Sequence, residues 1–450
     1  MRLFRRDTCA RGPQRLKSML LSALSTDLYE LTMIGGYYVK GVSGRATFDL
    51  FVRQLPPTRN YLVAAGLEQA LDFLESLRFT RDEIDYLRTV PALASLPRKF
   101  FDEYLADFRF TGDVAAIEEG TPVFAHEPFM RVTAPLAEAQ LVETALISEV
   151  MFPTAVASRA SRVIEAAAGR TVMEFGARRA HGIDAGIRAA RAAYLAGFDS
   201  SSIVEAGKRF GIPLSGTMAH SWVMAFRDEP SAFRAYAEVF GERAVFILDT
   251  YDALAAARII ALSGLRPKAV RLDSGDLITT SREVRRIFDE HGLRDTAIVA
   301  SGDLDELRIA EVVASGAPIS GFGVGTAIST SSDAPALSGV YKLAEIERGG
   351  AMMPVTKKSP GKQTYPGCKQ VWRTFRDGQA VEDVLMLASE EPPANAEPLL
   401  TDVMRNGVTL ARPSLDQIRQ RCRERVAQLP QAVRQVIDGK NYPVRIRIVS

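Results

Sequence analysis

The sequence has few cysteines and few histidines, and this scarcity excludes several classes of protein. Only three cysteines, Cys9, Cys368 and Cys422, occur in 450 residues. Their wide separation gives neither a disulfide framework nor the ligand spacing of a zinc site. Such cysteine usage is typical of a reducing compartment, so we expect a cytoplasmic location.

Two further absences narrow the choice of partners. No apolar run reaches the roughly 18 residues of a transmembrane helix, so no membrane span is predicted. The formal net charge is only +2, and residues 1–18 alone hold six basic residues against one Asp. The remainder therefore carries a net charge of about −3, so it has no excess of positive charge that would suggest nucleic acid as a partner.

The hydropathy pattern divides the chain into four parts. Residues 1–18 lack the features of a secretory signal, and we interpret them as a disordered tail or as sequence upstream of a true start at Met19. Residues 19–134 are predicted to form an α+β domain that begins with a helix over 25–40, capped by Ser25 or Thr26. Residues 339–450 return to strand patterns. We expect them to complete this domain and to add a basic substrate loop.

Residues 135–338 alternate between short apolar runs and amphipathic helices. The runs are RTVMEFG, IPLSGT, AVFILDT, KAVRLDSGD, TAIVASGD and ISGFGVGT. Buried strands that alternate with helices predict a parallel sheet. Six such strands in sequence favour an irregular or incomplete α/β barrel over an open sheet, so the predicted fold class is α/β.

Small and acidic residues gather where the predicted strands end. The clusters are LDTYD (248–252), RLDSGD (271–276), ASGDLD (300–305) and GFGVGT (321–326). Glycines and helix N-termini at the carboxyl edge of a parallel barrel are suited to phosphate groups. Helix caps and turns would explain any single cluster equally well. Four clusters in succession favour a binding site.

Basic residues near these clusters are candidates for anion contacts. Arg178 and Arg179 follow the first barrel strand directly, and paired guanidiniums suit a multiply charged anion such as pyrophosphate. Arg271 lies inside an apolar strand and needs either an acidic partner or a bound carboxylate. The loop 357–369, which contains Thr364, has four lysines and fits either closure over a phosphate or a plain basic surface.

His220 is the most informative of the four histidines. It lies in GTMAHSW (216–222), between a small-residue turn and an aromatic residue. Taken alone, this pattern fits a core histidine as well as a group that takes part in chemistry. His181 lies beside the arginine pair, whereas His126 and His291 are expected to be structural or exposed.

The ordered set of motifs resembles the nicotinate phosphoribosyltransferase family. The motifs are STDLYELTM, EFGARRAHG, GTMAHSW, LDTYD, VRLDSGDL, FGVGT and KQTYPG, and the resemblance covers about residues 22–445. It implies an α/β-sandwich N-terminal domain and the irregular barrel of type II phosphoribosyltransferases. The implied reaction joins nicotinate to phosphoribosyl pyrophosphate in NAD salvage. ATP hydrolysis is coupled to it through a phosphorylated histidine, and Mg²⁺ accompanies the phosphates.

The resemblance also implies a role for each matching residue. His220 is the implied phosphohistidine. Tyr29 would stack on the pyridine ring across the interface of a homodimer. The implied nicotinate contacts are Thr217 and Arg271, and the implied phosphoribosyl pyrophosphate contacts are Arg178, Arg179 and Thr364. The implied phosphate loops contain Ser301, Gly302, Gly323, Gly325 and Thr326. From the residues themselves we add Asp273 and Asp276 as candidate Mg²⁺ ligands.

Three alternatives remain open at this point. A nicotinamide phosphoribosyltransferase would use the same fold, although Arg271 favours a carboxylate over an amide. A barrel lyase or isomerase acting on a sugar phosphate would leave Tyr29, the arginine pair and the 357–369 loop without a role. A non-catalytic relative is disfavoured because none of the expected catalytic residues is missing.

Overall fold

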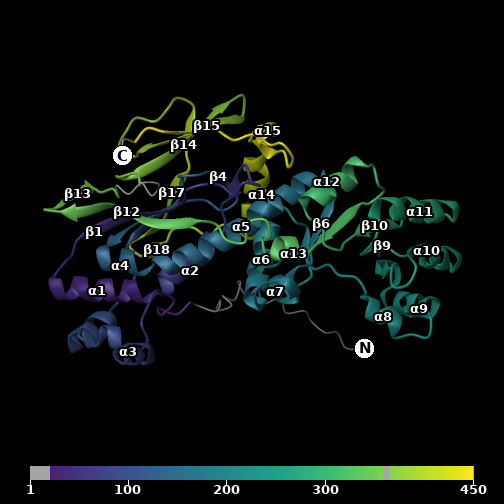
Figure 1. The fold of residues 1–450 in the computed structure, drawn as a ribbon, viewed down its shortest axis with the longest axis horizontal. Helices are drawn as coiled ribbons and strands as arrows, with labels where there is room; N and C mark the ends of the chain where they lie inside the picture. Colours follow the sequence, from purple (N-terminus) through teal and green to yellow (C-terminus); the bar gives the residue numbers. More distant parts are fainter. Residues whose placement is uncertain (1–20, 358–363, 449–450) are drawn as a thin grey trace, which may run out of the picture.

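The structure, a computed structural model, describes residues 21–357 and 364–448. Mainly antiparallel sheets occupy one end of the long axis of the molecule, and a parallel sheet with its helices occupies the other (Figure 1). The predicted tail and the centre of the basic loop lie outside the described residues. Within the described ranges, no helix is long and apolar enough to cross a membrane.

The first domain is built on a seven-stranded antiparallel sheet with strands from two distant parts of the chain. Strands from residues 339–409 lie beside strands from residues 45–135. In spatial order they are β13 (Ala351–Pro354), β12 (Gly339–Arg348), β1 (Arg45–Val52), β5 (Pro128–Pro135), β3 (Asp113–Ile117), β17 (Leu400–Arg405) and β18 (Val408–Thr409). Two small sheets accompany it: β16 (Ala396–Pro398), β14 (Lys369–Arg376), β15 (Gln379–Leu387) and β19 (Val444–Ile446), and β2 (Leu62–Val63) with β4 (Pro122–Val123).

The second domain has a six-stranded parallel sheet that curves into an incomplete barrel. Its order is β7 (Ser200–Ser201), β6 (Thr171–Glu174), β11 (Gly321–Val324), β10 (Ala297–Ala300), β9 (Ala269–Leu272) and β8 (Val245–Ile247). The prediction of a strand at IPLSGT was wrong, since only Leu214 makes an isolated bridge, to Ser201. The sheet opens between this segment and β8, which explains the irregular barrel.

Helices cover both domains. The first domain carries α1 (Leu28–Lys40), α2 (Leu67–Ser76), α3 (Arg81–Arg88), α4 (Leu136–Leu141) and the turns Pro91–Leu93 and Phe100–Leu105. The barrel carries α6 (Ile183–Leu195), α7 (Val204–Phe210), α8 (His220–Met224), α9 (Glu229–Phe240), α10 (Ala253–Leu262), α11 (Leu277–Glu290), α12 (Glu306–Ala314) and α13 (Thr326–Ser329), with the turns Ala177–Arg179 and Gly241–Arg243. Near the C-terminus lie α14 (Leu415–Ala427) and α15 (Gln431–Arg434).

The cap of α1 differs from the prediction. Asp27, rather than Ser25 or Thr26, is the N-cap residue, and it forms a capping box with Glu30. Glu30 also accepts hydrogen bonds from the backbone N–H and hydroxyl of Thr144, and it is fully buried. Burial raises the pKa of Glu30 to about 7.

The long helix α5 (Glu143–Ala167) joins the two domains (Figure 1). On one side, Ser158 Oγ accepts a hydrogen bond from the Val63 backbone at 2.8 Å. On the other, Arg159 Nε lies 3.0 Å from Glu306 Oε2 at the start of α12. Because most of α5 is buried between the domains, it fixes the barrel relative to the first domain.

Candidate active site

Residues that follow β8, β9 and β10 meet at the carboxyl edge of the parallel sheet. The Asp273 backbone N–H donates to Asp249 Oδ2 at 2.9 Å, and the Ser301 backbone N–H donates to Leu272 at 2.8 Å. The Ser301 hydroxyl also donates to Asp273 Oδ1. Three of the predicted clusters therefore form one connected hydrogen-bonded unit.

Gly302 is required by the close approach of two of these loops. Its φ is +92°, in the region that L side chains rarely adopt. A Cβ at this position would lie 1.9 Å from the backbone oxygen of Asp273. Glycine at 302 thus permits contact between the loops after β9 and β10.

Arg271 projects from β9 into this unit with its charge only partly compensated. Its Nη1 donates to Thr217 Oγ1 at 2.6 Å, and its Nη2 lies 3.7 Å from Asp273 Oδ2. Its Nε is buried and has no hydrogen-bond partner within the described residues. Burial, opposed by Asp273 and Asp249 and reinforced by the positive charge of Arg178, lowers the pKa of Arg271. Both alternatives for Arg271 thus have support: a structural contact and an unused donor for an anion.

His220 is the first residue of α8 and is accessible. Its Nδ1 lies 3.1 Å from Thr250 Oγ1, and its Nε2 lies 3.7 Å from Asp273 Oδ2. The side chain is 39% exposed, which contradicts the interpretation as a core histidine. One ring nitrogen is held by a hydroxyl, whereas the other faces a carboxylate at the edge of the site.

The arginine pair lies beside the glycine loop after β11. Arg178 and Arg179 are exposed in a short turn after β6, and neither guanidinium has a hydrogen-bond or ion-pair partner within the described ranges. β6 pairs with β11, and a Cβ at Gly323 would lie 2.5 Å from the Phe175 ring. Gly325 packs on the Phe175 backbone as the N-cap of α13, and Thr326 is the first residue of that helix.

The two candidate metal ligands have different surroundings. Asp276 is exposed and caps α11, accepting hydrogen bonds from the Ile278 and Thr279 backbones at 3.1 Å each. Asp273 lies inside the site, next to Asp249, whose buried Oδ1 has no hydrogen-bond partner among the residues that the structure describes. No group of three His, Cys, Asp or Glu side chains suited to a metal occurs in the described part of the chain.

Tyr29 and Thr364 lie far from these residues within one chain. Tyr29 is on α1 and is 44% exposed. Thr364 is buried between β13 and β14. In Figure 1 these elements lie at the opposite end of the long axis from α8 and β9. The other predicted site residues all belong to the barrel, whereas these two belong to the first domain.

Three residues at the site were not among the residues predicted from the sequence. Asp249 receives hydrogen bonds from the backbone of Asp273 and the hydroxyl of Ser274, and Thr250 holds His220. Both belong to the LDTYD cluster, so the position of this cluster at the end of a predicted strand could have indicated them. A third, Glu174 at the end of β6, is buried and accepts the Ser201 hydroxyl at 2.6 Å.

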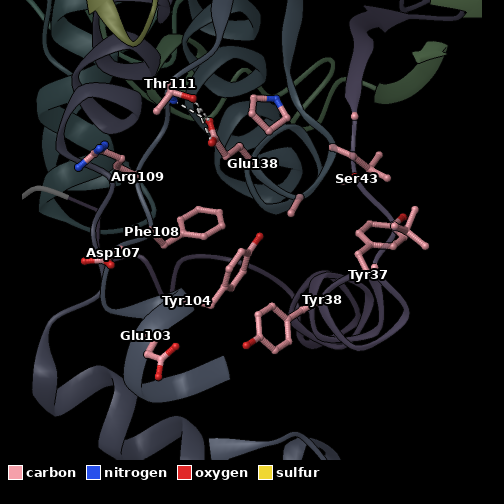
Figure 2. A pocket seen from close by; sticks show the side chains of 16 residues that line it. Tyr37, Tyr38, Ser43, Glu103, Tyr104, Asp107, Phe108, Arg109, Thr111 and Glu138 are labelled. Carbon is pink, nitrogen blue, oxygen red and sulfur yellow. Dashed lines mark hydrogen bonds between the residues drawn. The ribbon is translucent and has the colours of Figure 1, made fainter. Parts of the chain in front are cut away.

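A pocket of about 740 Å³ lies elsewhere, between the C-terminal half of α1, the segment 103–111 and the start of α4 (Figure 2). In its lining, the Thr111 backbone N–H donates to the Glu138 carboxylate at 2.6 Å. Burial raises the pKa of Glu138, and burial with the nearby Glu138 charge raises the pKa of Tyr104 to about 12. The pocket contains none of the predicted site residues.

Comparison with known proteins identifies the family. Models of the nicotinate phosphoribosyltransferase N-terminal domain, family and C-terminal domain match residues 24–151, 171–385 and 392–447. Nicotinate phosphoribosyltransferase pncB2 of Mycobacterium tuberculosis is 44% identical over 444 residues, covering 96% of this chain and 93% of that protein. The chain belongs to the nicotinate phosphoribosyltransferase family.

Other relatives and solved structures agree with this membership. The Bacillus subtilis nicotinate phosphoribosyltransferase is 45% identical over 361 residues, covering 78% of this chain and 73% of that protein. The crystal structure of human nicotinic acid phosphoribosyltransferase superposes with a TM-score of 0.82 at 29% identity, covering 94% of this chain and 97% of that one. The resemblance and the fold class predicted from the sequence are thus confirmed, and the chain is a transferase enzyme.

Proposed function

We propose that this enzyme makes nicotinate mononucleotide and pyrophosphate from nicotinate and 5-phosphoribosyl 1-pyrophosphate, in NAD salvage in the cytoplasm. The observation that carries the choice of substrate is the buried Nε of Arg271, which lacks a partner among the described residues. A nicotinate carboxylate would satisfy this donor and the charge, whereas the neutral amide of nicotinamide would satisfy the hydrogen bond alone.

In the transfer step, the protein mainly orients the two substrates and does not form a covalent bond with them. The pyridine nitrogen attacks C1 of the ribose, and the bond from C1 to the pyrophosphate oxygen breaks. By analogy with glycosyl transfer, positive charge develops on the sugar as negative charge builds on the leaving group. Arg271 and Thr217 would orient the ring, and Arg178 and Arg179 would stabilise the departing pyrophosphate.

Mg²⁺ fits the acidic side of the site. Mg²⁺ commonly uses one or two carboxylates together with substrate phosphates, so a cage of three acids is not needed. Asp273 suits this arrangement, and so does Asp249 Oδ1, which lacks a hydrogen-bond partner within the described ranges. Asp276 is engaged as a helix cap, which favours Asp273 of the two residues predicted from the sequence. When bound, the ion would neutralise phosphate charge.

ATP would act through His220. With Nδ1–H donating to Thr250, the Nε2 lone pair is available as a nucleophile. Nε2 would attack the γ-phosphorus of ATP, forming an N–P bond while the bond to the ADP oxygen breaks. Water would then release phosphate from the histidine. The 39% exposure of the side chain gives a nucleotide access to the ring.

Replacing His220 with alanine is expected to abolish ATP hydrolysis while leaving measurable transfer to nicotinate, because the proposed nicotinate and pyrophosphate contacts remain. Parallel assays of ADP and nicotinate mononucleotide measure this separation. His291→Ala is the matched control, since the His291 ring bonds to the Ile287 carbonyl near the end of α11, away from the site. Hydrolysis of ATP by the His220 variant at the wild-type rate would contradict the proposed role of His220 as the phosphorylated residue.

We further propose a homodimer with shared active sites. Exposed apolar side chains surround the carboxyl edge of the barrel: Ile183, Val204, Leu214, Met224, Tyr251 and Leu307. On α1, at the other end of the molecule, Leu28 and Tyr29 are also exposed. A second copy placed with its α1 over this edge would cover both surfaces and bring Tyr29 to the nicotinate site.

Mixing two inactive variants tests this arrangement. Tyr29→Ala and Arg271→Gln damage different chains of one shared site, so a mixed dimer keeps one intact site. After random exchange of subunits we expect about a quarter of the wild-type activity, because half of the dimers are mixed. Activity that stays at the level of the separate variants would place the whole site in one chain.

Substrate choice tests the proposed function itself. Purified enzyme is given phosphoribosyl pyrophosphate, Mg²⁺ and ATP with either nicotinate or nicotinamide, and the two mononucleotides are quantified. We expect kcat/KM for nicotinate to exceed that for nicotinamide by about 100-fold or more, corresponding to one charge-assisted contact. A preference for nicotinamide would support the alternative reaction.

A further inference from the structure

A buried ion pair joins the central sheet of the first domain to the segment that contains Thr364. Lys369 Nζ lies 2.6 Å from Asp49 Oδ2, and the two side chains are only 4% and 2% exposed. Asp49 is in the middle of β1, whereas Lys369 is the first residue of β14. Charged side chains are rare at such positions, so the pair needs an explanation.

The contacts of this pair are unevenly distributed. Besides its ion pair with Asp49, the Lys369 ammonium donates to the backbone oxygens of Tyr365 at 2.5 Å and Gly367 at 2.9 Å. Apart from this ammonium, neither oxygen of Asp49 has a donor among the described residues. A carboxylate with so few donors is a poor source of stability. The pair therefore contributes little to the free energy of folding. Its hydrogen bonds to Tyr365 and Gly367 instead anchor the turn 365–367.

The anchored turn leads directly to Thr364. The Gly367 N–H donates to Ala344 of β12 at 3.0 Å. On the other side, the Thr364 carbonyl accepts the Thr356 hydroxyl at 2.6 Å, and Thr364 Oγ1 accepts the Lys357 N–H at 3.1 Å. Thr364 Oγ1 also lies 3.4 Å from Thr356 Oγ1, a long contact that a phosphate oxygen could replace as the acceptor of the Thr364 hydroxyl proton. The backbone around this donor is thus fixed from both sides.

We propose that the Lys369–Asp49 ion pair is a positioning element for phosphoribosyl pyrophosphate. It holds the turn 365–367 against the sheet so that the Thr364 hydroxyl is preorganised toward the phosphates. This inference rests on the proposed function, because it gives Thr364 its role there. Lys369 and Asp49 do not themselves touch the substrate, and their effect passes through the backbone of the turn.

The double variant Asp49→Leu/Lys369→Met tests the proposal. Replacing both charges with apolar side chains of similar size leaves no unpaired buried charge, so the protein should fold with little change in its thermal midpoint. We expect KM for phosphoribosyl pyrophosphate to rise about 10-fold or more, while KM for nicotinate and kcat change little. The amide of Gly367 should exchange its hydrogen about 10-fold faster or more, because its segment has lost its anchor.

Thr364→Val is the companion variant, because it removes the hydroxyl and keeps the ion pair. It should raise KM for phosphoribosyl pyrophosphate to a similar extent while Gly367 exchanges at the wild-type rate. A folded double variant with unchanged KM would overturn the proposal even if exchange increased. If the wild-type enzyme makes no mononucleotide, the proposed function fails, whereas the exchange measurement still reports whether the ion pair anchors the turn.

Discussion

Replacing Arg271 with glutamine is expected to lower kcat/KM for nicotinate by about 100-fold, or about 2.7 kcal/mol, the scale of a hydrogen-bonded charge contact. Glutamine keeps a donor for Thr217 and removes the positive charge. Use of nicotinamide, which has no carboxylate, should fall much less. Steady-state kinetics with both substrates measure the difference.

The same variant should not be less stable than the wild type. The Arg271 guanidinium is largely buried, with one direct hydrogen bond to Thr217 and a longer contact to Asp273. Removal of a poorly compensated buried charge is close to neutral for folding or stabilising. Arg266→Gln, at an exposed position, is the matched control. Equal losses with nicotinate and nicotinamide would show that Arg271 acts through the fold and not through a carboxylate.

Gly302→Ala is expected to reduce both stability and activity. The left-handed backbone alone costs about 1–2 kcal/mol for alanine. Because its Cβ would lie 1.9 Å from the Asp273 oxygen, the loops after β9 and β10 must also separate. We expect a total loss of about 3 kcal/mol or more in the free energy of unfolding, together with loss of transfer activity, as Asp273 and Ser301 move apart.

Gly316→Ala separates the two causes. Gly316 has a similar φ of +68°, and a Cβ at this position would meet no other atom within 4 Å. Alanine there should cost only about 1–2 kcal/mol, the cost of the left-handed backbone, and leave activity unchanged. Urea denaturation and initial rates measure both variants. If the two variants lose the same stability, the close contact between the site loops is not a constraint.

Much of the barrel could be predicted because its strands and helices alternate along the chain. Strand ends alternate with helices, and chain order alone brings the clusters at 249, 273 and 301 to one edge. The errors came from weak local signals. β7 has only two residues, and IPLSGT is an extended segment with one bridge, so neither has a distinctive pattern. Asp27 was overlooked because Ser25 and Thr26 are equally good caps by residue type.

Contacts between distant segments could not be predicted from the pattern. The sequence does not show that Asp249 receives the Asp273 backbone, or that Thr250 holds His220, because these contacts depend on loop geometry. The separation of α1 and β14, which carry or adjoin Tyr29 and Thr364, from α8 and β9 is likewise visible only in three dimensions (Figure 1). The position of these two residues is the reason for proposing a site shared between two chains.

The most direct test of the account is product formation by the purified enzyme from nicotinate, phosphoribosyl pyrophosphate and Mg²⁺, with and without ATP. Mass spectrometry and a pyrophosphate assay follow the two products. We predict nicotinate mononucleotide and pyrophosphate in equal amounts, formed faster in the presence of ATP. Consumption of phosphoribosyl pyrophosphate without any nicotinate mononucleotide would contradict the central claim.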